Sequence, residues 1–377
     1  MSSNKSETLV AILSDLVAFD SVDHNYEQKQ ACINYVENHL KDFNLQINRF
    51  ERNGFPSLVA STKSGRQPHI LLQAHLDVVP SLKMSRVMTE KKGKLYGRGV
   101  YDMKFAAASY LQLVHDLGDD LQDYDFSLMF TTDEEIGGND GVGYLVELGY
   151  RPKVCIIPDG GNDWQIEERC NDVWIANIKS SGISAHGSRP WEGDNAIYKL
   201  VEAVIEIRNL FGEQKPFKNS ITLSQINGGN AENQVPDEAS ATLDMRFINH
   251  DQYFSMRKKV QKIVDKYELV LKDGTIYDGR RVELNHPEID KFLTCAETVL
   301  GKKIIPTQSL GSSDAHFFAA IGIPTIVIRP EGGAAHSEEE WISVNGFLDF
   351  HQVLLEYIKA AAKRPKLSKL DKALAAM

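Results

Sequence analysis

The chain has 377 residues, which is too long for one ordinary domain and suits two, one of them interrupted by the other. Hydrophobic residues make up 42% and charged residues 25%, a globular mix that excludes a disordered or fibrous protein. The net charge of −10 argues against a nucleic-acid-binding surface.

The first twenty residues have apolar side chains at helical spacing with acidic residues between them, so they lack the apolar core of a signal peptide. No stretch approaches the roughly 18 apolar residues of a membrane span. The cysteines are scattered without CxxC pairing, which suits reduced thiols: Cys32, Cys155, Cys170 and Cys295. We therefore expect a cytoplasmic protein that does not act at a membrane.

Short apolar runs predict three buried strands in the first half of the chain, at 69–73, 126–130 and 154–157. Between the first two, residues 103–118 have one apolar face at helical spacing, and Gly118 suits the end of that helix. A fourth run follows at 325–328. The alternation of strand and helix indicates an α/β domain with a mostly parallel sheet and helices on both faces.

Residues 173–285 have a different pattern. Apolar and polar residues alternate at 172–182 and 238–249, as in half-solvated antiparallel strands, and two helical segments lie between and after them. We predict an inserted α+β domain that interrupts a first domain formed by 1–172 and 286–377. The basic tail at 363–377 predicts a solvated amphipathic helix.

Metal-ligand residue types follow the predicted strands. In an open parallel sheet ligands bind beyond the carboxyl ends of the strands, so these side chains are expected at one edge. Each alone has an ordinary explanation: a structural histidine, a solvated acidic loop, or a helix cap at Asp102. The residues are His75, Asp77, Asp102, Glu134, Glu135, Asp159 and His336.

Two imidazoles and three carboxylates without a thiolate suit zinc, cobalt or manganese. This set has too many anions for one tetrahedral zinc, but two ions roughly 3.5–4 Å apart that share one carboxylate would use all of it. Two cations would also offset the repulsion within the run Asp133-Glu134-Glu135, leaving one acid free for chemistry.

At these residues the chain resembles the M20 family of co-catalytic zinc peptidases and deacylases. The matching motifs are "HLDVVP", "GRGVYDMK", "TTDEEIGG", "SAHGSRP", "NQVPDEASATLDMR", "GSSDAHFF" and "GGAAHS". They run from residue 75 to residue 337 in the family's order, so the resemblance covers nearly the whole chain.

The resemblance implies a role for each of the metal-ligand types. His75 and Asp159 would bind one zinc ion, Glu135 and His336 would bind the other, and Asp102 would bridge the two.

It also implies two roles without metal ligation. Asp77 would orient the His75 imidazole as an outer carboxylate. Glu134 would be the general base, taking a proton from the water between the ions and passing it to the leaving nitrogen of an amide.

The resemblance implies that 173–285 is a lid and dimerisation domain inserted in a zinc-binding catalytic domain. Two residues of the insert match family motifs. His186 resembles the lid histidine that stabilises the oxyanion, often across a dimer; the alternative is a surface-loop histidine. Asn233 resembles a substrate-positioning asparagine, and a turn residue before a proline is the alternative.

Three further residues have substrate roles by the same resemblance. Arg246 would bind a substrate carboxylate, or else pair with Asp244 or another acid. Gly332 and Gly333 would let the backbone approach the substrate, or form only a flexible turn.

Two positions depart from the family's pattern. Asp159 replaces the glutamate usual in carboxypeptidases and deacylases and matches the aminopeptidases and dipeptidases, which favours peptides with a free amine. Phe105 stands where glycine is frequent, so the packing beneath Asp102 is expected to differ.

Three functions therefore compete. The first is a two-zinc peptidase that cleaves dipeptides or small peptides, and the second is a deacylase of N-acyl amino acids in the same fold. The third is a metal-bound scaffold without hydrolytic activity, against which the unligated base Glu134 argues. We also expect a homodimer through the inserted domain.

Overall fold

The computed structural model describes residues 3–81, 86–277, 279 and 282–364. It divides into two compact units. The first takes Met1–Glu168, Val282–Thr307 and Ser313–Met377, and the second takes Arg169–Arg281 and Gln308–Ser312. The second unit thus gains a short segment that the sequence assigned to the catalytic domain. The predicted helix of the basic tail lies outside the described residues from 365 onward.

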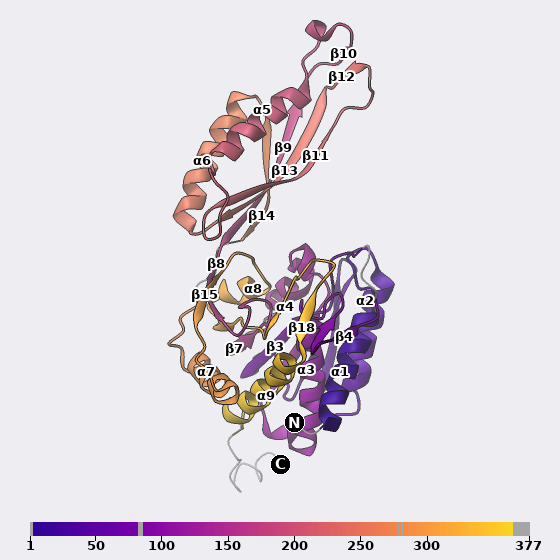
Figure 1. Cartoon of the computed structure of the whole chain (residues 1–377), viewed down its shortest axis with the longest axis vertical. Helices are drawn as coiled ribbons and strands as arrows, with labels where there is room; N and C mark the ends of the chain where they lie inside the picture. Colours follow the sequence, from indigo (N-terminus) through magenta and orange to yellow (C-terminus); the bar gives the residue numbers. More distant parts are fainter. Residues whose placement is uncertain (1–2, 82–85, 278, 280–281, 365–377) are drawn as a thin grey trace. The chain divides into compact units, whose positions relative to one another are not determined.

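The first unit, which carries the labels β3 and β7 in Figure 1, is built on a six-stranded sheet. Its order is β1 (Gln46–Arg52), β2 (Phe55–Ser61), β6 (Phe126–Thr131), β3 (Ile70–His75), β7 (Val154–Ile156) and β16 (Thr325–Ile326). The last four strands in this order are mutually parallel. Strand β2 is antiparallel to both of its neighbours, β1 and β6. The prediction of a mostly parallel sheet is confirmed.

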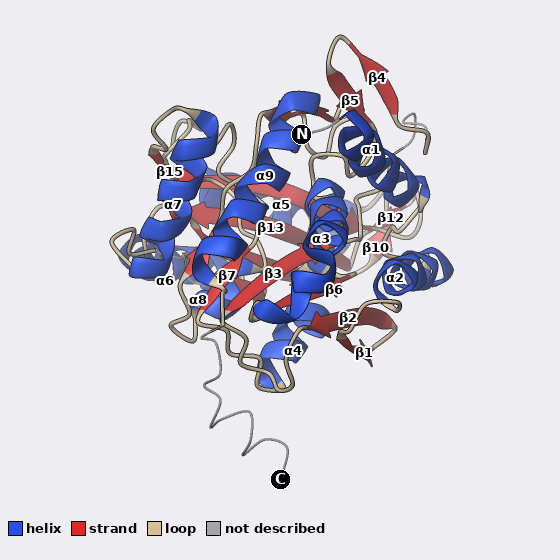
Figure 2. Cartoon of the chain, turned by 90° about the horizontal axis from the view of Figure 1, so that it is seen from below, coloured by secondary structure: helices blue, strands red, loops and turns tan. Residues whose placement is uncertain are grey.

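Helices cover both faces of this sheet, as predicted. One core joins Leu72 and Leu128 to the larger group of helices, and a second core joins Leu71 and Met129 to the smaller group. The larger group, part of which lies in front of the strands in Figure 2, is α1 (Ser3–Ala18), α2 (Tyr26–Leu40), α3 (Lys104–Leu117), α7 (Pro287–Leu300) and α9 (Val344–Ala361). The smaller group is α4 (Tyr144–Glu147) and α8 (Ala315–Ala319). Burial on both faces explains why these strands are continuous apolar runs.

Helix α3 is buried on every side rather than amphipathic. Every side chain from Lys104 to Val114 is buried, and even the Lys104 ammonium donates hydrogen bonds inward, to the carbonyls of Leu16 and Phe19 at 3.0 Å each. Gly118 ends the helix, as predicted, with a φ of 46°. The burial fixes the start of α3, two residues after Asp102.

A small antiparallel sheet combines two strands that precede α3 in the sequence with two strands that precede α9. It orders β17 (Gly332–Gly333), β18 (Trp341–Ser343), β5 (Lys94–Tyr96) and β4 (Thr89–Lys91). Because β18 pairs with β5, the segment after His336 lies next to the segment before Asp102.

The second unit is a four-stranded antiparallel sheet in the order β11 (Ser220–Gly228), β13 (Glu238–Phe247), β9 (Asp172–Ser181) and β14 (Val270–Tyr277). Helices α5 (Ala196–Asn209) and α6 (His250–Lys266) share one core with its apolar residues. Strands β10 (Ala185–His186) and β12 (Gln234–Val235) form a separate pair. Strands β8 (Ile166–Cys170) and β15 (Pro306–Ser309), each with residues in both units, form another pair.

Within the described part of the chain, none of the helices has the length and apolar character needed to cross a bilayer.

Because both faces of the sheet are covered, shortening a buried side chain on either face should lower the free energy of unfolding by a similar amount. Leu71 and Leu72 are both 0% exposed and point to opposite cores. Leu71→Ala and Leu72→Ala should each lower the free energy of unfolding by about 2–5 kcal/mol, because each leaves a cavity. Denaturant unfolding measures this, with the exposed Ile305→Ala as control. A near-neutral Leu71→Ala would contradict the covering of the second face.

Candidate metal centre

Three parallel strands deliver candidate ligands to one edge of the sheet. His75 is the last residue of β3, a single 3-10 turn at Glu134–Ile136 follows β6, and Asp159 lies three residues beyond β7. Parallel strands end at the same edge, so these residues meet although they are far apart in sequence.

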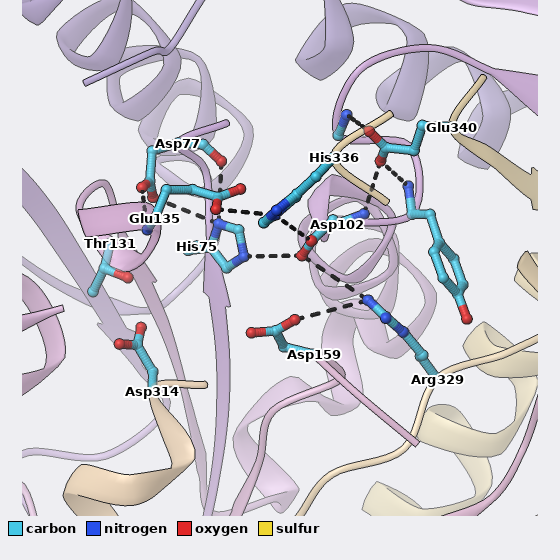
Figure 3. A network of polar contacts seen from close by, with 12 residues as sticks. His75, Asp77, Asp102, Thr131, Glu135, Asp159, Asp314, Arg329, His336 and Glu340 are labelled. Carbon is cyan, nitrogen blue, oxygen red and sulfur yellow. Dashed lines mark hydrogen bonds and ion pairs between the residues drawn. The ribbon is translucent and has the colours of Figure 1, made fainter. Parts of the chain in front are cut away.

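Asp102 lies between the two histidines (Figure 3). Its Oδ1 is 3.4 Å from His75 Nε2, and its Oδ2 is 3.1 Å from His336 Nε2. His336 comes from the loop between β17 and β18 and has a φ of 63°, a left-handed conformation that is uncommon outside glycine. The two oxygens of one carboxylate therefore face two different imidazoles.

The carboxylates and imidazoles form two groups, and within each group the potential ligand atoms all lie within 4.8 Å of one another. One group is Asp102, Glu135 and His336, and the other is His75, Glu134 and Asp159. Glu134, expected to be an unligated base, thus lies in the same group of potential metal ligands as His75 and Asp159.

The hydrogen bonds of His75 define which ring nitrogen is free. Its Nδ1 lies 3.1 Å from the carbonyl oxygen of Asp77, which can only accept, so Nδ1 carries the proton. Nε2 is therefore the ring nitrogen directed at Asp102. Asp77 Oδ1 lies 3.5 Å from Nδ1, and its Oδ2 accepts the N–H of Glu135 at 2.9 Å, so Asp77 ties two candidate ligands together.

These residues fit a metal. His75 is 1% exposed, and its Nε2 has no hydrogen-bond partner, although it is directed at a carboxylate. Burial and then the charge of Asp102 raise the pKa of Asp159 to about 8, and burial with the charge of Asp159 raises the pKa of Glu134 well above its usual range. Buried carboxylates of this kind ionise together only beside a cation, and the imidazole lone pair needs an electron-pair acceptor.

His336 is the exposed member of the set. Hydrogen bonds to Asp102 and Glu135, the latter at 3.1 Å, raise the pKa of its imidazole to about 10. Its exposure leaves this side of the centre open to solvent.

Arg329 is a site residue that the sequence analysis missed. Its Nη1 lies 3.8 Å from Asp159 Oδ1 and 4.0 Å from Asp102 Oδ1, and its guanidinium lies 4.1 Å from the centre of the Tyr101 ring. Its Nε donates to Asn162 Oδ1 at 2.8 Å. The signal was available, because Arg329 directly follows the fourth apolar run.

Two buried acids were also missed. Glu340 accepts hydrogen bonds from the backbone around Asp102. Asp314, in the motif "GSSDAHFF", accepts from Gln73 Nε2 at 2.9 Å, and burial followed by the charge of Asp133 raises its pKa well above the usual range. The residues next to these two acids in the sequence do not distinguish them from acids on the protein surface, so the sequence analysis could not identify them.

The candidate substrate residues of the insert lie in the second unit. His186 is exposed on β10, with Nδ1 2.8 Å from Ser188 Oγ. Asn233 lies beside it, because its carbonyl accepts the N–H of Gly187 at 2.7 Å. These two motifs, nearly fifty residues apart, are neighbours through the pairing of β10 with β12.

Arg246 pairs with Asp244, which was the alternative to a role in binding a substrate carboxylate. Its Nε and Nη2 donate to the two oxygens of Asp244 at 2.6 and 2.8 Å, so the guanidinium is held by an internal carboxylate.

The glycines and Phe105 have packing roles. Gly332 and Gly333 belong to β17 rather than to a flexible turn, and a Cβ on Gly332 would lie 2.2 Å from the Tyr101 ring. Phe105 fills the space beneath Asp102 by packing against Tyr101, Phe347 and Phe350.

The family model described as "Peptidase family M20/M25/M40" matches residues 71–360. The chain belongs to this family. It is therefore a hydrolase of a metal-dependent family, and the resemblance inferred from its motifs is confirmed.

Individual relatives extend over most of the chain. The succinyl-diaminopimelate desuccinylase of Corynebacterium glutamicum is 26% identical over 356 residues, which are 88% of this chain and 91% of that protein. Among solved structures, a tripeptidase of Staphylococcus aureus is 20% identical with a TM-score of 0.76, covering 95% of this chain and 99% of its own. The dipeptidase Dug1p of Saccharomyces cerevisiae is 13% identical with a TM-score of 0.75, covering 96% and 98%. The solved structures share the fold of this chain.

The placement of Asp102 predicts unequal effects of two substitutions on metal binding. On the two-ion arrangement expected from the sequence, Asp102→Asn should weaken the binding of both ions, whereas His336→Gln should weaken the binding of one, because each imidazole faces a different oxygen of Asp102. Metal analysis after dialysis and competition with a chromogenic chelator measure both effects. Two ions retained with unchanged affinity in Asp102→Asn would refute the shared position.

Proposed function

We propose that this protein is a two-zinc peptidase that cleaves the amide bond of dipeptides or small peptides, with cobalt or manganese as possible replacements. Asp102 is the shared ligand, His75 and Asp159 complete one ion site, and Glu135 and His336 complete the other. The observation that supports this most is the Asp102 carboxylate, whose two oxygens each face a different imidazole.

When bound, the two ions would polarise the amide carbonyl and lower the pKa of the attacking water. Glu134 is the residue that would take the proton, because its carboxyl lies beside His75 and Asp159, which would hold one of the ions. A carboxylate at this place can accept a proton from water and pass it to the leaving nitrogen.

Asp77 keeps His75 in the tautomer that presents Nε2, as described above. His186 is proposed to stabilise the oxyanion and Asn233 to position the substrate. Arg246 would bind a substrate carboxylate only after exchanging its internal partner Asp244.

The preference for peptides rests on Asp159 in place of glutamate. The tripeptidase and dipeptidase folds are consistent with it. A second candidate, the deacylase, is favoured by the 26% identity to a desuccinylase over 88% of the chain. Membership in a hydrolase family argues against the scaffold. The homodimer through the inserted domain stays a prediction.

Substitutions of the adjacent residues Glu134 and Glu135 test whether each acts as the general base or as a metal ligand. Glu134→Gln should retain both zinc ions and lower kcat by about 10²–10⁴-fold, the usual contribution of a general base. Glu135→Gln should lose one ion. Metal content and kcat measured on the same preparations separate the roles. Loss of an ion from Glu134→Gln would make Glu134 a ligand, as its place beside His75 and Asp159 permits.

The substrate class is tested with zinc-loaded protein on dipeptides, tripeptides, N-acetyl amino acids and N-succinyl amino acids. We expect the highest kcat/KM with peptides that have a free amine, and loss of activity after metal chelation that zinc restores. Turnover of N-succinyl amino acids alone would establish the deacylase instead. Full activity after complete removal of metal would exclude both.

A further inference from the structure

Glu340 joins the two loops that carry Asp102 and His336. It lies four residues after His336, directly before β18, and is 0% exposed. A carboxylate is almost never fully buried unless it is paired, so its partners indicate its role.

Each oxygen of Glu340 accepts two hydrogen bonds, and Figure 3 shows it beside Asp102. Oε1 accepts the backbone N–H groups of Tyr101 and Asp102 at 2.9 and 3.0 Å. Oε2 accepts the N–H of Gly99 at 3.0 Å and the Arg98 Nη1 at 2.8 Å. The side chain thus holds most of the segment that leads into Asp102.

Apart from Glu340, this segment is held by turn hydrogen bonds from the Val100 N–H to the Gly97 oxygen at 3.2 Å and from the Lys104 N–H to the Gly99 oxygen at 2.9 Å. Strand β5 ends at Tyr96 and α3 begins at Lys104, so the amides between them lie outside any strand or helix. Buried backbone N–H groups require acceptors, and here three of them share a single carboxylate. Gly97 adds a fourth contact, because its N–H donates to the backbone oxygen of Glu340 at 3.3 Å.

The partner residue Arg98 supplies the balancing charge. It is 8% exposed and forms its ion pair with Glu340 at 2.8 Å. A buried carboxylate that has both a cation and three amide donors is fixed in place, because moving it would leave several buried groups unpaired.

We propose that Glu340 is a positioning residue for the metal centre. Through the Asp102 amide it sets the position of the shared carboxylate, and through four residues of chain it sets that of His336. The proposal rests on the shared-ligand role of Asp102 in the proposed function. Outer partners of metal ligands typically change metal affinity or activity by 10–100-fold when they are removed.

The test compares Glu340→Gln with wild-type protein. Glutamine keeps the shape but places an NH₂ group where one oxygen accepted two donors. We expect zinc affinity to fall about 10–100-fold by chelator competition. We also expect a changed visible spectrum of the cobalt-loaded protein, and faster hydrogen exchange of the amides of Gly99, Tyr101 and Asp102. kcat should fall more than KM changes.

Two further variants complete the design. Arg98→Met removes one of the four donors to the Glu340 side chain and leaves the three amides, so it should give a smaller change in the same direction. It also serves as the test if Glu340→Gln does not fold. Glu339→Gln, an exposed neighbour, should behave as wild type.

Metal affinity and a cobalt spectrum equal to wild type in Glu340→Gln, with only a lower melting temperature, would overturn the proposal and leave Glu340 a stabilising residue. If Glu340→Gln does not fold, an Arg98→Met variant with wild-type metal affinity and spectrum overturns it equally. The Asp102→Asn variant separates failure of the proposed ligand role of Asp102 from failure of the positioning role of Glu340. If it binds both ions as wild type does, the proposed ligand role fails; if it loses them while Glu340→Gln does not, only the positioning role fails.

Discussion

The active region of the first unit depends on one carboxylate, that of Asp102, being held between two imidazoles from distant parts of the sequence. Two packing features make this possible. The burial of α3 from Lys104 to Val114 fixes the start of that helix, and the pairing of β18 with β5 brings the His336 loop to it. His75 is positioned by the sheet alone, because it is the last residue of the central strand β3. The centre is thus a product of the sheet, one buried helix and one small antiparallel sheet.

The run Asp133-Glu134-Glu135 shows how three adjacent acids can divide their tasks. Asp133 turns inward, where its Oδ2 accepts the N–H groups of Asp140 and Gly141 at 2.8 and 2.9 Å and closes the loop. Glu134 and Glu135 enter the two different groups of potential ligands. Burial, followed by the charge of Asp77, raises the pKa of Asp133 to about 6, so the cost of gathering these acids extends to the one with a structural role.

Much of this architecture could be predicted from the sequence because it depends on long, regular patterns. Strands buried on both faces are continuous apolar runs, and those of the insert alternate with period two. The strands of the small sheet have two or three residues, too few for any period. The ligand types were visible at the strand ends. Glu340 was not, since the glutamates of "SEEEW" differ only in what surrounds them once the chain has folded.

Arg329 gives the centre a resident positive charge. A chelator can strip metal ions from a protein, but it cannot remove a guanidinium that lies 3.8 Å from Asp159 and 4.0 Å from Asp102. In metal-free protein these acids therefore keep part of the counter-charge that they require, so their mutual repulsion is partly offset by a side chain of the protein itself.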